Sequence, residues 1–117
     1  MSSVRQNKVA DRIRDVIAES LTGDLLRDPR LKGVTITKVQ VSGDLQIAKV
    51  YFTSYFDEHS EADMKKALKG CAGFFRKELS SALFMRRVPT MNFYYDKSLE
   101  QQNQIERLFD KINKESK

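Results

Sequence analysis

Apolar residues recur at two different spacings along this chain of 117 residues, and each change of spacing marks an expected element. Over residues 4–26 they follow one another at intervals of three and four, which predicts an amphipathic helix. The Asp28-Pro29-Arg30 triplet should end this helix, because proline disfavours helical geometry at the residue before it. Two stretches rich in β-branched and aromatic residues follow, and they predict strands at 34–41 and 46–56.

The two expected strands are joined by a polar turn at Ser42, Gly43 and Asp44, so a β-hairpin is the simplest arrangement. Side chains alternate between the two faces of a strand, and the second strand has one apolar face that should meet the helices. That face carries Ala48, Val50, Phe52 and Phe56. The opposite face carries Lys49, Tyr51, Thr53 and Tyr55.

A second helical pattern covers residues 61–85 and begins at a capping pair, Ser60 and Asp63. Its apolar stripe continues through Gly70 and Gly73, although each glycine costs a helix about 1 kcal/mol relative to alanine. We therefore expect a kink or break between two helices that pack on one core.

The rest of the chain predicts a third strand and a last helix. The strand, 90–95, begins after Pro89 and alternates apolar with polar positions, and the helix, 98–114, is capped by Ser98 and followed by a frayed tail at 115–117. We find no linker, repeat or low-complexity stretch. Residues 1–117 are thus expected to form one α+β domain, with a three-stranded sheet packed against helices.

Charge narrows the choice of partner. The chain has 21 Lys and Arg against 16 Asp and Glu, a net charge of +5 and a sequence pI near 9.4, which favours a polyanionic partner; ordinary solubilising charge explains the totals equally well. A single cysteine cannot form an intramolecular disulfide, and no apolar run reaches the roughly 18 residues that span a bilayer. Without the apolar core of a secretion signal either, we expect a cytoplasmic protein with no membrane contact.

Catalytic residues are sparse. His59 is the only histidine and lies in a polar connection, so one chain cannot assemble a Ser-His-Asp triad or a histidine-based metal site. Cys71 has no base at helical spacing and is better explained as a small packed side chain. Phosphate-loop and dinucleotide-binding glycine motifs are missing. We expect no enzyme activity, no cofactor, no metal and no small-molecule substrate.

The basic residues are better organised than the acidic ones, and they form three clusters. One lines the first turns of the first helix, one lies along one side of the second helical region, and one precedes Pro89. Gly73 lies within the second cluster, where a missing side chain would let a phosphate approach the main chain. The candidate RNA-binding residues are Arg5, Lys8, Arg12, Lys65, Lys69, Gly73, Arg76, Lys77, Arg86 and Arg87.

A solvated surface explains any one of these clusters about as well as RNA does, but three in a basic protein favour RNA. Tyr51 and Tyr55 on the outer strand face could also stack bases, although cross-strand packing accounts for them equally well. Gly70 and Gly73 form a G-x-x-G pattern, which in KH modules clamps four nucleotides of single-stranded RNA.

Several separate motifs match one family in order and spacing. The order of elements is that of a type II KH domain, and the chain resembles bacterial ribosome-binding factor A over nearly its whole length. The matching stretches are DPRL at 28–31 with VTITKV at 34–39, DLQIAKVY at 44–51, GFFR at 73–76, RRVPTMNF at 86–93 and DKS at 96–98.

The resemblance implies a non-catalytic assembly factor. Such a factor binds free or precursor small (30S) ribosomal subunits, not translating ribosomes, and assists late maturation and 5′-end processing of 16S rRNA as a cytoplasmic monomer with a role in cold adaptation. In this family a helix kink at an Ala-x-Gly sequence replaces the G-x-x-G loop, which corresponds here to Cys71, Ala72 and Gly73. Gly70 would then not be half of a clamp.

One alternative from another class stays open at this point. The chain could be a protein-binding adaptor that docks a partner through its last helix or the edge of its sheet, with its charge serving solubility alone. A hydrolase acting on RNA is the least favoured class, since no acid, base or metal set is visible.

Overall fold

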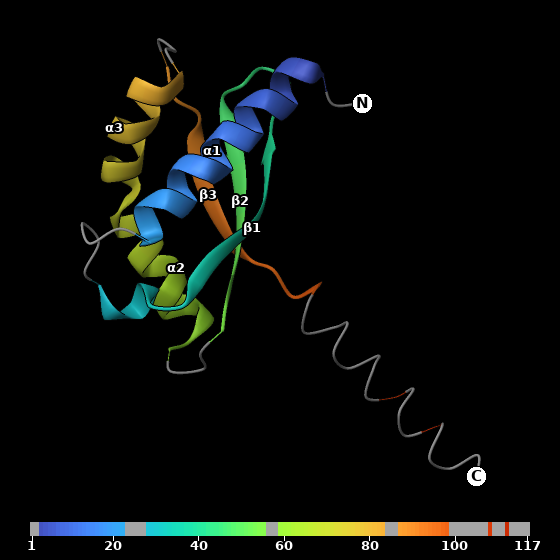
Figure 1. The fold of residues 1–117 in the computed structure, drawn as a ribbon, viewed down its shortest axis with the longest axis vertical. Coiled ribbons are helices and arrows are strands. Elements are labelled where there is room, and N and C mark those ends of the chain that lie inside the picture. Colours follow the sequence, from blue (N-terminus) through green and yellow to red (C-terminus); the bar gives the residue numbers. More distant parts are fainter. Residues whose placement is uncertain are drawn as a thin grey trace.

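A computed structural model describes residues 3–22, 28–55, 59–83 and 87–98, together with Leu108 and Ile112 (Figure 1). The elements along the chain are α1 (Val4–Thr22), the 3-10 turn η1 (Pro29–Leu31), β1 (Val34–Val41), β2 (Ile47–Ser54), α2 (Glu61–Gly70), α3 (Ala72–Leu83) and β3 (Thr90–Tyr95). This order is consistent with the predicted α+β, KH-like fold.

The sheet has the order β1-β2-β3 and is mixed. β1 and β2 run antiparallel, which confirms the predicted hairpin, and β2 and β3 run parallel with α2 and α3 as the crossover between them. In the hairpin turn the Asp44 carboxylate accepts hydrogen bonds from the Ser42 hydroxyl (2.6 Å) and the Gln46 N–H (3.1 Å). The short polar side chains that predicted this turn therefore also hold it.

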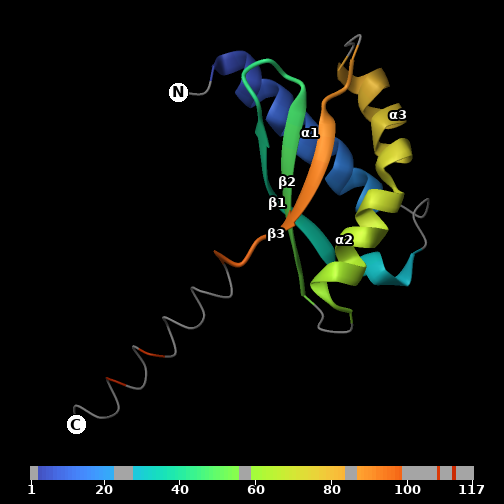
Figure 2. The same ribbon diagram turned by 180° about the vertical axis from the view of Figure 1, so that it is seen from behind.

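The described helices α1, α2 and α3 cover one face of the sheet, and none of them covers the other, which we call the open face. Figure 1 shows α1 in front of the strands and α3 beside it, and Figure 2 shows the strands from their open side. α1 packs against β1 and α3, while α2 contacts β3 and η1. In the core between the layers, the side chains with no solvent exposure include Ile13, Ile17, Ala48, Val50, Phe52, Leu68, Phe75 and Leu79.

The Asp28-Pro29-Arg30 motif forms a local turn that leads into β1. Asp28 accepts a hydrogen bond from the Arg30 N–H (2.9 Å), and the Arg30 guanidinium donates to both carboxylate oxygens from Nε (3.0 Å) and Nη2 (2.7 Å). These bonds hold the pKa of the Asp28 carboxyl below its usual value. Leu31 then enters the core, and Gly33, with φ of 81°, makes the left-handed step for which glycine is suited.

Some element boundaries expected from the sequence differ from those in the structure, and others fall outside the described residues. β2 is shorter than the expected 46–56, and Thr53, expected on the exposed face, is only 6% exposed. The end of the first expected helix, at 23–26, and Phe56 fall outside the described residues. So does most of the expected helix 98–114, with the tail 115–117; Ser98 is itself helical, and its N–H and hydroxyl donate to Asp96 (2.9 and 2.6 Å).

Candidate nucleic-acid interface

The break in the second helical region occurs at Cys71. α2 ends at Gly70 and α3 begins at Ala72, and Cys71 lies between them with φ of −91° and ψ of 1°. Its N–H donates to the carbonyls of Ala67 (3.2 Å) and Leu68 (3.0 Å), and its own carbonyl accepts from Phe75 (3.0 Å). Because hydrogen bonds continue through the junction, the feature is a kinked helix pair rather than a loop, as predicted.

The two glycines near the kink are not required by packing. Gly70 closes α2 and Gly73 lies in the first turn of α3, both exposed. A Cβ atom built on either residue would meet no atom within 4 Å. Neither has a positive φ. The main chain at Gly73 is therefore open to an approaching ligand, and the fold itself gives no reason for a glycine there.

Cys71 is a packing residue in this geometry. The side chain is half-buried, and burial, reinforced by the negative charge of Asp28, raises the pKa of its thiol. A thiol that stays protonated is a poor nucleophile. Among the described residues, no cluster of three or more His, Cys, Asp or Glu side chains could hold a metal ion.

The first cluster of candidate cations lies on α1. On α1, Arg5, Lys8 and Arg12 are exposed, and Arg12 lines a groove between α1 and α3 that also contains Glu19 and Glu78. The amide of Gln6 donates to the Val41 carbonyl (3.0 Å), which places the start of α1 at the hairpin end of β1. The start of the α1 cluster thus lies near the hairpin end of β1, and its last member, Arg12, lies beside acidic side chains.

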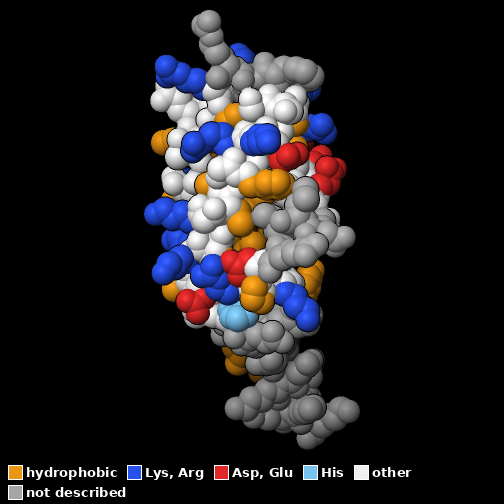
Figure 3. All heavy atoms as spheres, turned by 90° about the vertical axis from the view of Figure 1, so that its left-hand side faces the viewer, with side chains coloured by type: hydrophobic (Ala, Val, Ile, Leu, Met, Phe, Trp, Pro, Cys, Tyr) orange, Lys and Arg blue, Asp and Glu red, His pale blue; other side chains and the backbone are white. Residues whose placement is uncertain are grey.

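The cations of α2 and α3 have different surroundings. Lys65 and Lys69 line a shallow hollow with Asn92 and Tyr94 of β3, so α2 directs them toward the edge of the sheet. Arg76 and Lys77 are exposed on α3. In Figure 3 basic side chains follow the left margin of this side of the molecule, toward the open sheet face, with some acidic ones among them at the lower left; another acidic group lies at the upper right margin, where basic side chains are also present.

The third cluster is only partly described. Arg87 is exposed between α3 and β3, and Arg86 lies outside the described residues. Among the described candidates, Arg12 of α1 thus lies beside α3, whereas Lys65 and Lys69 of α2 lie beside β3.

Sequence reasoning singled out Tyr51 on the open sheet face but missed its two neighbours there, Lys38 and Tyr94. The Tyr51 and Tyr94 rings lie 5.6 Å apart between centroids, and the Lys38 ammonium lies 4.5 Å from the Tyr51 centroid. Strict alternation would point Lys38 toward the core, but a register shift between Ile36 and Lys38 turns it outward. The adjacent polar pair Thr37-Lys38, inside an otherwise alternating strand, was the available signal.

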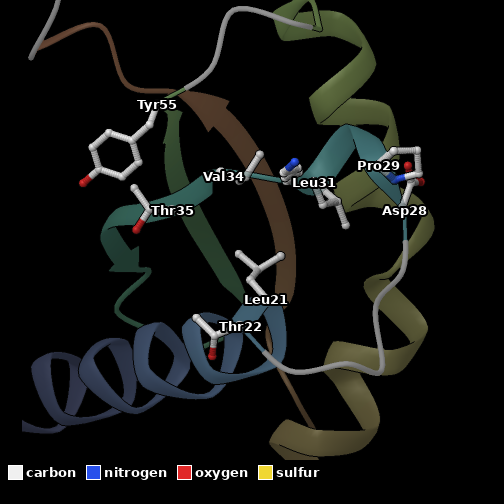
Figure 4. A pocket seen from close by; sticks show the side chains of 10 residues that line it. Leu21, Thr22, Asp28, Pro29, Leu31, Val34, Thr35 and Tyr55 are labelled. Carbon is white, nitrogen blue, oxygen red and sulfur yellow. The ribbon is translucent and has the colours of Figure 1, made fainter.

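The two candidate stacking tyrosines have different environments. Tyr51 packs across the sheet against Tyr94, whereas Tyr55 is 74% exposed beyond the end of β2. Tyr55 borders a hollow of about 550 Å³ between the end of α1, η1 and β1 (Figure 4). Leu21, Leu31 and Val34 line that hollow, and Asp28, the one carboxylate among its described lining residues, is paired with Arg30.

A comparison with protein families decides where the chain belongs. The model of the family described as ribosome-binding factor A matches residues 5–109. This chain belongs to the ribosome-binding factor A family. A family member from Thermomicrobium roseum is 39% identical over 115 residues, which cover 98% of this chain and 88% of the relative.

Solved structures of this family share the fold. The solution NMR structure of a Thermotoga maritima protein, a candidate ribosome-binding factor A, superposes with a TM-score of 0.70 at 29% identity, over 84% of this chain and 92% of that one. A homology model of Thermus thermophilus ribosome-binding factor A, fitted into a cryo-EM map of its complex with 30S, gives 0.60 at 21% identity, over 83% and 97%. In the described part of this chain, no helix has the length and apolar character needed to cross a bilayer.

Proposed function

We propose that this protein binds free or precursor 30S ribosomal subunits and assists late maturation and 5′-end processing of 16S rRNA. The observation that carries this proposal is the family match over residues 5–109. The Thermus thermophilus family member has been fitted into a map of its complex with 30S, which names the target for that protein. The exposed cations around the kink supply the matching chemistry here.

The kinked helix pair would bind the sugar–phosphate backbone rather than read bases. Lysine and arginine contacts to phosphates fix the position of a protein on RNA but carry no sequence information. Lys69, Arg76 and Lys77 are exposed on either side of the kink, and Gly73 between them presents main chain without a side chain. A phosphate could therefore approach close to α3 while cations neutralise its charge.

We further infer that the protein acts without catalysing a reaction, as a cytoplasmic monomer whose single domain holds an rRNA conformation. The raised pKa of the Cys71 thiol and the commitment of Asp28 to Arg30 support a non-catalytic role. In this mechanism charge supplies affinity, and the shape of the folded rRNA surface selects the site.

The decisive test is co-sedimentation with precursor 30S subunits over a range of salt concentrations. Each phosphate contact contributes about 0.7 to 0.9 to the slope of log affinity against log salt. Lys69→Gln should weaken binding and flatten that slope by about one contact. Lys66→Gln, also exposed on α2 and removing the same charge, is the matched control and should change neither. Binding by the parent protein that is insensitive to salt would overturn the proposal.

One observation favours a second function, the protein-binding adaptor. Leu108 and Ile112, four residues apart, are 59% and 54% exposed, so a helical seam could accept a partner. If Leu108→Ser with Ile112→Ser abolishes association with the ribosomal fraction while Lys69→Gln has no effect, the adaptor is favoured. If nuclease digestion of the extract releases the protein instead, RNA binding is favoured.

A further inference from the structure

The open face of the sheet carries a row of two adjacent aromatic rings with a cation at each end. The row begins with Lys38 on β1, whose ammonium lies 4.5 Å from the Tyr51 ring centroid on β2. Tyr51 lies 5.6 Å from Tyr94 on β3, at an interplanar angle of 33°. The Lys65 ammonium reaches from α2 to 5.3 Å from the Tyr94 centroid. Four separate elements thus contribute one side chain each.

The fold holds this row in place by specific bonds. The register shift in β1 places Lys38 opposite Tyr51, and the parallel pairing of β2 with β3 places Tyr51 opposite Tyr94. Thr37, at the bulge, donates to the Asp96 carboxylate (2.6 Å) just after β3. β1 and the end of β3 are therefore tied together across β2, which holds the two rings side by side.

Charge on this face matches an anionic ligand. Beside the two rings, Gln40, Lys49 and Asn92 pair with one another across the three strands, and all three are exposed. Amide groups and a further cation therefore border the rings. Lys69 stands beside Asn92 in the hollow at the edge of the sheet. The carboxylate of Asp96, just after β3, already accepts hydrogen bonds from Thr37 and Ser98.

We propose that Lys38, Tyr51, Tyr94 and Lys65 form a platform for unpaired RNA bases, with the lysines binding the flanking phosphates. This inference rests on the proposed function, since it adds a second contact to the same rRNA-binding protein. Its ligand is a single-stranded segment, whereas the kinked helices would meet the backbone of folded RNA. The two sites share α2, which contributes Lys65 to this row and Lys69 to the kinked helix pair, and they differ in the aromatic rings, which only the row contains.

The energetic comparison favours a base over the present cation contacts. Stacking one base on an aromatic side chain contributes roughly 5- to 150-fold in affinity, whereas an exposed cation–π contact contributes only about 2- to 5-fold. An incoming base would therefore displace each ammonium from its ring. The displaced lysine remains within reach of the phosphate of the stacked nucleotide, so its charge is used again rather than lost.

Intrinsic tyrosine fluorescence provides a direct test, because the chain has no tryptophan and four tyrosines. The probe is a hexamer of adenylate RNA, titrated into the full-length protein at two salt concentrations. Stacking should quench part of the tyrosine emission. Tyr51→Leu with Tyr94→Leu should lower the affinity at least 10-fold without changing the salt slope, because rings contribute no counterion release.

Three further variants make this result specific. Tyr51→Phe with Tyr94→Phe keeps both rings and should bind as the parent does; because this variant and the leucine variant lack the reporting tyrosines, their affinity is measured by the fluorescence anisotropy of a labelled hexamer. Tyr55→Leu removes an exposed tyrosine next to β2 but outside the row, and should also leave affinity unchanged. Lys38→Gln should reduce the salt slope by about 0.7, the value for one phosphate of a single strand. If the leucine variant fails to fold, chemical-shift changes at the Tyr51 and Tyr94 rings of the parent replace it.

The outcomes separate this inference from the proposed function. If the folded leucine variant binds the hexamer within 2-fold of the parent, or the parent rings show no shift on addition of RNA, the platform is overturned. The 30S proposal would stand if Lys69→Gln still loses 30S affinity. If the leucine variant binds the hexamer normally but loses 30S subunits, the face docks on a protein, and the RNA platform is again overturned.

Discussion

The two faces of the sheet use the same strands for different purposes. On the covered face Ala48, Val50 and Phe52 have no solvent exposure and pack under the helices. The intervening residues of β2, Lys49 and Tyr51, lie on the open face with the lysine–tyrosine row. Stability constrains the first set closely, because buried side chains fill a close-packed interior. It constrains the second set weakly, so the aromatic and basic content of the open face suggests recognition.

The largest effect expected from this comparison is at Phe52. Phe52→Ala removes a fully buried ring that packs edge-on against Tyr95 (5.6 Å between centroids) and should lower the free energy of unfolding by about 3 to 5 kcal/mol. The neighbouring Tyr51→Ala, on the open face, should cost only about 1 kcal/mol. Urea denaturation of both variants measures the difference; equal losses would contradict the division between the faces.

A smaller effect is expected at Asp96, which joins the open face to the end of β3. Hydrogen bonds from Ser98 and Thr37 lower the pKa of its carboxyl in the folded state. A lowered folded pKa stabilises the fold above the unfolded pKa of about 3.9, and this stabilisation is lost as pH falls through the folded value. Asp96→Asn should cost about 1 kcal/mol at neutral pH, since hydrogen bonds to a charged acceptor are lost.

The same variant makes the acid response specific. Below about pH 4 the free energy of unfolding of the parent should fall more steeply than that of Asp96→Asn. Asp11→Asn, an exposed carboxylate on α1, is the control and should keep the full parental slope. Thermal melts from pH 2 to 7 provide the measurement. If the free energy of unfolding of the parent and of Asp96→Asn changed with pH in parallel, the hydrogen bonds of Asp96 would not contribute as proposed.

At the kink, a gain in stability is expected. Gly73→Ala should raise the free energy of unfolding by up to about 1 kcal/mol, because alanine is the better helix former and its Cβ would enter open space. Gly70→Ala should also tolerate its new methyl group. If a phosphate approaches Gly73, only the 73 variant should lose affinity for 30S subunits. A loss of stability at Gly73 would show that the fold itself requires the glycine.

The smallest expected effect lies within the open face. A double-mutant cycle between Lys38→Gln and Tyr51→Leu should show a coupling of about 0.5 to 1 kcal/mol in the free energy of unfolding, the size of an exposed cation–π contact. The same cycle between Lys49→Gln and Tyr51→Leu is the comparison and should give a smaller coupling. A coupling above 2 kcal/mol would show that this contact contributes to the stability of the fold, against the division between the two faces.

Much of the fold could be predicted because local chemistry marks its boundaries. β1 and β3 occupy the predicted ranges 34–41 and 90–95, since Gly33 and Pro89 mark their starts and alternation fills their lengths. The two glycines predicted a kink in this region, whereas only the family resemblance indicated the residues 71–73, and the helices are interrupted at Cys71. Low helix propensity shows that a helix is weak in a region, but not at which residue the backbone bends.

The candidate site was harder to predict than the fold. Helical spacing correctly identified exposed rows of cations, but it could not show that Arg12 faces a groove with Glu19 and Glu78. The contact of Lys65 with Tyr94 joins residues from different elements, which no periodic pattern encodes. Lys38 was missed because a bulge reverses the side-chain alternation on which strand predictions depend.

The parallel pairing of β2 and β3 has a consequence for the order of folding. β1 and β2 form a local hairpin that can close early, whereas β3 can join β2 only after α2 and α3 have crossed the sheet. Tyr51 and Tyr94 therefore meet only when this crossover is complete. A nascent or partly folded chain would lack the paired rings, so the open face becomes competent to bind only in the finished molecule.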